Sequence, residues 1–113
     1  NPTTSSKILI PSKQEKKAYE AEQNRIQADI ERAEKEIHQL YDQIEEDTTF
    51  MKMELQLGNM ARALDHSRRK DNHESLLPSY QAQRDASTQE LAATKEFWYQ
   101  KYGAPFGWKK WEE

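Results

Sequence analysis

The feature that most restricts the fold of this chain is a long stretch without helix breakers. Residues 13–57 contain neither Gly nor Pro and consist mainly of Glu, Lys, Gln, Ala, Arg and Ile. These residue types favour helix, so the sequence predicts one long helix over residues 12–69. The alternative is a kink or break at residues 47–49, where a new N-cap fits, or at residues 58–59, where Gly58 weakens a helix interior by about 1 kcal/mol relative to Ala.

The start of the predicted helix is marked by a capping box. Ser12 and Glu15 have the required spacing, so that the Ser12 hydroxyl accepts a hydrogen bond from the Glu15 amide while the Glu15 side chain accepts one from the Ser12 amide. Pro11 agrees with this start, because proline suits the entry to a helix better than its interior. Residues 1–11 are predicted to form an extended arm, which either docks on a partner or is a disordered tail.

Apolar residues recur with a heptad period along this helix. The two core positions of the heptad hold Gln23, Ile30, Ile37, Ile44 and Met51, and Tyr19, Ile26, Ala33, Leu40 and Asp47. Such a stripe is typical of the seam of a coiled coil or a helical bundle. Ile at the first position favours two strands when the helices run parallel, and antiparallel pairing within the chain is left open.

The apolar stripe changes phase after Asp47. The next residues to share a face are Phe50, Met53, Leu57, Met60 and Leu64. A stutter in the heptad repeat accounts for this offset, and it either alters the supercoil locally or marks a turn.

The chain contains few apolar residues against which this helix could pack. Hydrophobic residues make up 35% of the chain and charged residues 33%, and Val is absent. Such a chain has too little apolar material for a thick core, and isolated helices are marginally stable in water. The predicted fold is therefore all-α and elongated, with the stripe buried against another helix of the same chain or of a different one.

The C-terminal half is predicted to hold a loop, a second helix and a tail. Residues 70–79 contain turn-forming residues and Pro78, which indicate a loop, and Ser79 then caps a shorter helix over residues 80–102. The apolar stripe of this helix is weak and consists of Tyr80, Arg84, Ser87, Leu91, Thr94 and Trp98. Gly103 and Pro105 end the helix, so residues 103–113 are predicted to form an irregular tail.

Aromatic residues are concentrated in this last part of the chain. Seven of the eleven, including all three Trp, lie between Phe97 and Trp111. Trp and Tyr bury large areas at low conformational cost and dominate binding hot spots, so the tail is predicted to dock on a partner. The alternative is an internal cluster on the chain's own helices. Together with the stripe, the predicted protein-binding residues are Ile26, Ile30, Ile37, Leu40, Ile44, Met51, Phe97, Trp98, Tyr102, Phe106, Trp108 and Trp111.

Residue types that catalysis and cofactors require are missing or scattered. The absence of Cys excludes disulfides, thiol nucleophiles and Cys-based zinc sites, and three Gly form no phosphate-binding loop. His66 and His73 are two helical turns apart, too far to share one ion, so we interpret them as surface residues. We expect no catalytic residue, no metal site and no cofactor.

Charge and hydropathy restrict the class of partner. The formal net charge of −3 argues against nucleic acid, whereas Arg62, Arg68, Arg69 and Lys70 suit an acidic protein surface. No apolar run exceeds three residues, so no membrane span is predicted. The lack of Cys favours an intracellular protein, and the cytoplasm or cytoskeleton is the expected location.

These patterns together predict a non-enzymatic structural or scaffold subunit of a larger assembly, which binds other protein chains through its helix and its tail. By analogy of shape, the first expectation is a cytoskeletal or ciliary (axonemal) accessory protein. The alternative is a homodimeric coiled-coil adaptor that presents two copies of the tail to a partner.

Overall fold

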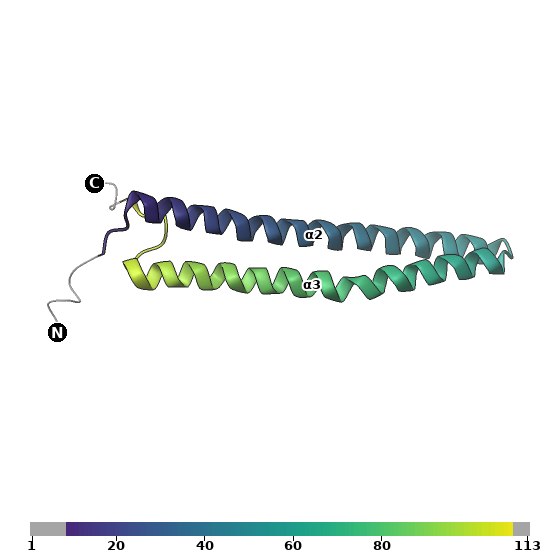
Figure 1. Cartoon of the computed structure of the whole chain (residues 1–113). Coiled ribbons are helices and arrows are strands. Elements are labelled where there is room, and N and C mark those ends of the chain that lie inside the picture. Colours follow the sequence, from purple (N-terminus) through teal and green to yellow (C-terminus); the bar gives the residue numbers. More distant parts are fainter. Residues whose placement is uncertain (1–8, 110–113) are drawn as a thin grey trace. The chain divides into compact units, whose positions relative to one another are not determined.

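Two long helices make up most of the chain in a computed structural model, which describes residues 9–109. Helix α2 spans Lys13–Gln56 and helix α3 spans Met60–Tyr102 (Figure 1). The described residues contain no strand, so the prediction of an all-α fold is confirmed. Two compact units share these helices. We name Asn1–Asp29 with Ala86–Glu113 the terminal unit, and Ile30–Asp85 the loop unit.

The N-terminus of α2 has the predicted capping box. The Glu15 amide donates to the Ser12 hydroxyl at 3.0 Å, and the Ser12 amide donates to the Glu15 carboxylate at 3.1 Å. Both amides belong to the first helical turn, where no carbonyl is available to accept from them. Of the predicted arm, residues 1–8 lie outside the described residues, while residues 9–12 are not helical.

The turn between the helices is a Schellman motif followed directly by an N-cap. Gly58 has a φ of 79°, its amide donates to the Leu55 carbonyl at 3.1 Å, and the Asn59 amide donates to the Glu54 carbonyl at 2.8 Å. The Asn59 carbonyl then accepts the first hydrogen bond of α3, from Ala63, at 3.0 Å. The two helices of the loop unit therefore run antiparallel on either side of a three-residue connection (Figure 1).

Two predicted boundaries are wrong. A helix over residues 12–69 does not form, because the alternative break at residues 58–59 ends α2 at Gln56. The loop predicted over residues 70–79 is absent, because these residues lie inside α3 together with Pro78. Proline in a helix interior costs roughly 3 kcal/mol, but Pro78 is exposed, so water can hydrate the carbonyl that its missing N–H leaves unpaired. Packing of the residues around it outweighs the local penalty.

The predicted heptad stripe of α2 is the buried face of both units. In the loop unit the buried residues of this stripe are Ile30, Ala33, Ile37, Leu40 and Asp47, and in the terminal unit they are Tyr19 and Ile26. The stripe predicted for the second helix is also confirmed, since all six of its residues are buried or half-buried. In each unit, the hydrophobic stripe of α2 thus packs against a stripe of α3 that contains more polar residues.

The predicted change of phase after Asp47 does not occur in the packing. Met51 and Glu54 continue the original heptad and are half-buried, whereas the residues of the shifted stripe are exposed. Helix α2 therefore keeps its heptad register up to its end at Gln56. The apolar residues that suggested a stutter are left on the surface of the loop unit.

Candidate protein-binding surfaces

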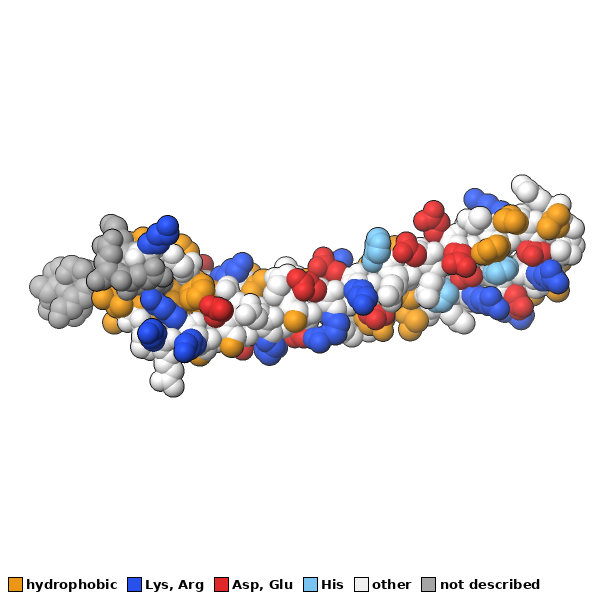
Figure 2. All heavy atoms as spheres, turned by 90° about the horizontal axis from the view of Figure 1, so that it is seen from above, with side chains coloured by type: hydrophobic (Ala, Val, Ile, Leu, Met, Phe, Trp, Pro, Cys, Tyr) orange, Lys and Arg blue, Asp and Glu red, His pale blue; other side chains and the backbone are white. Residues whose placement is uncertain are grey.

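Among residues 9–109, the largest group of exposed apolar side chains lies beside the turn of the loop unit. Six of them occur within 15 residues, with exposed fractions of 40 to 70%. We name this group the loop-end surface, and it consists of Phe50, Met53, Leu55, Leu57, Met60 and Leu64. Orange side chains appear at the right-hand end of Figure 2, among blue Lys and Arg and red Asp and Glu side chains. Leu55, Met60 and Leu64 line one groove, whereas Phe50, Met53 and Leu57 lie on the other side of α2, since a helix turns about 100° per residue. Exposed apolar groups near one turn are typical of interaction sites.

One side of the loop-end surface is hollowed into a groove between α2 and α3. Its volume is about 210 Å³. It is lined by Met51, Leu55, Met60, Ala63, Leu64 and Ser67. Methionine side chains are flexible and polarisable, and they adapt to the shape of an apolar partner. The lining of the groove is therefore mostly apolar and adaptable, and Ser67 contributes the one hydroxyl.

The loop-end surface is also locally basic. Residues 50–70 contain five Lys or Arg and two Asp or Glu, in a chain whose formal net charge is −3. Lys52 follows Met51 of the groove, and Arg68 lies one helical turn after Leu64. Both cations are exposed, and neither forms an ion pair with another residue in the described part of the chain.

The terminal unit holds an aromatic cluster built from both helices and the residues after α3. The Trp98 ring lies 4.3 Å from the Tyr19 ring and 4.4 Å from the Tyr102 ring, measured between centroids. Phe106 lies 4.8 Å from Tyr19 and 5.3 Å from Trp98, where it meets the indole edge-on. Tyr19, Trp98 and Tyr102 are at most 8% exposed. The alternative of an internal cluster therefore holds for these rings.

Hydrogen bonds from Ser12, Lys101 and Tyr102 to the Glu15 carboxylate connect the two helices of the terminal unit, and we name them the clasp. The Glu15 carboxylate accepts from the Tyr102 hydroxyl and, at 3.3 Å, from the Lys101 ammonium. The same carboxylate accepts from the Ser12 amide of the capping box. The Tyr102 hydrogen bond is the main cause that lowers the pKa of Glu15 from 4.5 to about 2, followed by the bonds from Ser12.

The lowered pKa of Glu15 predicts an acid-sensitive contribution to stability. The ionised carboxylate stabilises the folded chain fully above pH 4.5, and this contribution is lost as the pH falls through about 2. We therefore expect the melting temperature of wild type to exceed that of Glu15→Gln above pH 4.5, with the difference vanishing near pH 2. Circular dichroism melts between pH 2 and 7 measure this difference. A constant difference over the whole range would contradict the role of the ionised clasp.

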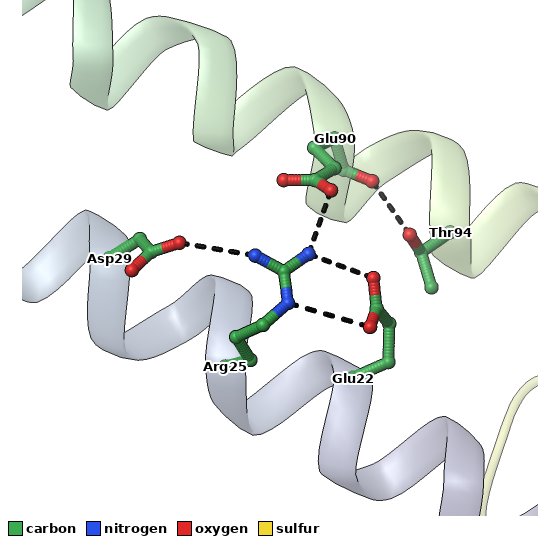
Figure 3. Close-up of polar contacts among 5 residues, drawn as sticks. All are labelled: Glu22, Arg25, Asp29, Glu90 and Thr94. Carbon is green, nitrogen blue, oxygen red and sulfur yellow. Dashed lines mark hydrogen bonds and ion pairs between the residues drawn. The ribbon is translucent and has the colours of Figure 1, made fainter.

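An arginine on α2 joins the two helices on the surface of the terminal unit. The Arg25 guanidinium contacts Glu22 at 2.8 Å and Asp29 at 3.3 Å on α2, and Glu90 at 2.8 Å on α3 (Figure 3). The hydrogen bond from Arg25 lowers the pKa of Glu22. These side chains are one third to one half exposed, so water and salt screen their interactions. Arg25 therefore connects the two helices at the surface, and its ion pairs do not form a binding site.

A buried carboxylate in the loop unit lies between two histidines. Asp47 is 7% exposed and occupies a core position of the heptad, and its oxygens lie 3.0 Å from Nδ1 of His73 and 3.4 Å from Nδ1 of His66. His66 also stacks on Phe50 at 5.4 Å. The interpretation of His66 and His73 as surface residues is therefore wrong. They form hydrogen bonds with the buried Asp47 carboxylate. A polar residue at such a seam position can fix the register of paired helices.

The structure divides the predicted binding residues into three groups. Those buried or half-buried within their own unit are Ile26, Ile30, Ile37, Leu40, Ile44, Met51, Trp98, Tyr102, Phe106 and Trp108. Phe97 is 68% exposed and is not part of the aromatic cluster. Trp111 lies outside the described residues. Six residues of the first group, Ile26, Ile30, Ile37, Leu40, Trp98 and Tyr102, are at most 8% exposed within their own unit, and their role in binding a partner stays a prediction.

Sequence reasoning missed the loop-end surface as a binding site. The signal was present, because Phe50, Met53, Leu57, Met60 and Leu64 depart from the heptad of the buried stripe. A residue that is out of phase with a seam lies on the outer face of a helix if the seam continues. The same offset also fits a stutter or a turn, and a stutter would place these residues inside.

Within residues 9–109, no group of three or more His, Cys, Asp and Glu side chains is arranged to hold a metal ion. Neither of the two helices contains an apolar segment of the length that crossing a bilayer requires, as far as the described residues extend. Comparison of the chain with protein-family models, curated proteins and solved structures finds no match.

Proposed function

We propose that this chain is a non-enzymatic structural subunit that binds another protein through its loop-end surface. The observation that carries this proposal is the concentration of six large exposed apolar side chains between residues 50 and 64. Leaving such a surface in water is unfavourable, since burial of apolar area contributes about 25 cal/mol per Å². A partner that covers it supplies this free energy to binding.

The proposal moves the binding site away from the stripe and the aromatic cluster. In the coiled-coil hypothesis, Ile30 and Ile37 pack on another chain, but here each is at most 8% exposed within the loop unit. A homodimer through this stripe would require α3 to leave it. We therefore retain protein binding and replace the surface. The cytoskeletal or ciliary setting and the intracellular location stay predictions of the sequence.

Cross-linking in the native source, followed by purification and mass spectrometry, tests this function. We expect the wild-type chain to carry at least one other protein in near-stoichiometric amount, and the double variant Met60→Gln with Leu64→Gln to lose at least about tenfold of it. Both residues are exposed, so the variant should keep the helicity of wild type in circular dichroism. Phe97→Gln, an equally exposed residue of the terminal unit, is the matched control.

Two results would contradict the proposed function. In the first, cross-linked wild type is recovered without any other protein. In the second, the same partner is recovered in full by the double variant and lost by Phe97→Gln, which would place protein binding on the terminal unit.

A further inference from the structure

We propose that the partner segment bound by the loop-end surface is an acidic amphipathic helix of a different protein, which lies in the groove between α2 and α3. This inference rests on the proposed function and adds the chemistry of the occupant.

The groove has the features that receive a helix. It lies between the antiparallel helices of the loop unit, and its apolar lining consists of Met51, Leu55, Met60, Ala63 and Leu64. A third helix laid along two paired helices places its side chains at positions i, i+3, i+4 and i+7 into such a channel. Leu55 and Leu64 are about half exposed, so the contact surface is present without rearrangement.

The rim of the groove selects an acidic partner. At about 100° per residue, Lys52 lies outward of Leu55 on α2 and Arg68 lies outward of Leu64 on α3, at opposite edges of the groove, whereas Asp65 lies on another face of α3. Both are exposed and lack an ion-pair partner among residues 9–109. Asp71, one turn beyond Ser67, is the first acidic residue past the basic segment. Carboxylates that flank the apolar face of a bound helix therefore meet unpaired cations on both sides.

A lipid surface is the competing occupant for a basic, apolar region. A protein bound at a bilayer interface places exposed apolar side chains in the headgroup region, beside Lys and Arg. Phe50, Met53 and Leu57 are exposed in this way, but Leu55, Met60 and Leu64 line a hollow between two helices. The geometry thus favours a helix, which fills the hollow, over a flat layer of headgroups.

Selection from a peptide library tests the chemistry of the occupant. The probes are 16-residue peptides with Leu or Ile fixed at positions 4, 8, 11 and 15, and with the remaining positions drawn from Ala, Gln, Glu and Lys. They are selected on the full chain at low salt. We expect the enriched peptides to contain more Glu than Lys. One such peptide, measured by fluorescence anisotropy, should bind Leu64→Gln roughly tenfold more weakly than wild type, and Phe97→Gln with wild-type affinity.

The rim cations are tested by the salt dependence of the same peptide. In the double variant Lys52→Gln with Arg68→Gln, we expect a smaller loss of affinity between 50 and 300 mM salt than in wild type. The matched control is Lys13→Gln with Lys17→Gln, which removes two exposed cations from the terminal unit and should leave the salt dependence unchanged.

The inference is overturned by enrichment of Lys-rich peptides, by absence of any enriched peptide, or by equal binding of wild type and Leu64→Gln. It is also overturned if wild type floats with vesicles of phosphatidylcholine and phosphatidylserine while Leu64→Gln does not, because the occupant is then a lipid surface. The proposed function fails separately, when cross-linked wild type is recovered from its native source without another protein.

Discussion

Replacing Trp98 by Ala is expected to lower the free energy of unfolding by roughly 3 to 5 kcal/mol, the range for loss of a buried aromatic side chain. Trp98 is 4% exposed, and its ring contacts those of Tyr19, Tyr102 and Phe106. Its removal leaves a cavity among three rings that belong to both helices and the residues after α3. Because small proteins unfold at a cost of about 5 to 15 kcal/mol, the loss is a large fraction of the total.

Urea denaturation followed by circular dichroism at 222 nm measures this loss. Phe97→Ala is the matched control, because Phe97 is the adjacent residue on α3 and is 68% exposed. We expect the control to change the free energy of unfolding by no more than about 0.5 kcal/mol. Equal stability of Trp98→Ala and Phe97→Ala would contradict the internal cluster and return Trp98 to the set of residues available for a partner.

The parts of the fold that could be predicted are those in which local and tertiary signals agree. Between Tyr19 and Leu40 the heptad stripe, the helix propensity and the absence of Gly and Pro all indicate the same buried face. The capping box at Ser12 and the glycine at 103 mark helix ends by local hydrogen bonding alone. The Gly103 amide donates to the Tyr99 carbonyl at 2.7 Å, and the φ of Gly103 is 73°.

Prediction failed where tertiary packing outweighs a local signal. Pro78 and the polar residues before it indicate a loop, but His73 and Leu77 take positions on the inner face of α3 and keep the segment helical. The sequence cannot show that Pro78 faces solvent, because that depends on which face of the helix the other helix covers. The turn could not be predicted for the same reason. Gly58 is compatible both with a kinked helix and with a hairpin, and tertiary packing decides between them.

The candidate site was missed for a related physical reason. An apolar stripe is the same signal whether a chain buries it or leaves it for a partner, so Phe50, Met53 and Leu57 could not be separated from core residues by periodicity alone. Asp47 is the residue that indicates whether the heptad continues. As a carboxylate in the seam it needs polar neighbours on the opposite helix, and His66 and His73, seven residues apart, have the spacing of one face. That match favours an uninterrupted heptad and therefore an exposed second stripe.

Replacing Ile26 by Asp is expected to destabilise the chain by more than about 3 kcal/mol, because it places an unpaired carboxylate at a fully buried position. Ile26 is 0% exposed and lies in the terminal unit, on the face of α2 that packs against α3. For a chain of about this size, such a loss lowers the melting temperature by more than about 12 °C. Ile26→Ala adds no charge and should cost roughly 2 to 5 kcal/mol by loss of buried apolar contacts.

Thermal melts followed by circular dichroism distinguish burial inside the chain from burial by a partner. Ile10→Asp is the matched control, because Ile10 is also in the terminal unit but is 68% exposed, and its melting temperature should stay close to that of wild type. If Ile26 were covered only in a complex, the purified chain would tolerate Asp at both positions equally. A large loss in Ile26→Asp alone means that α3 already covers the stripe, so that a partner must bind at a surface that folding leaves exposed.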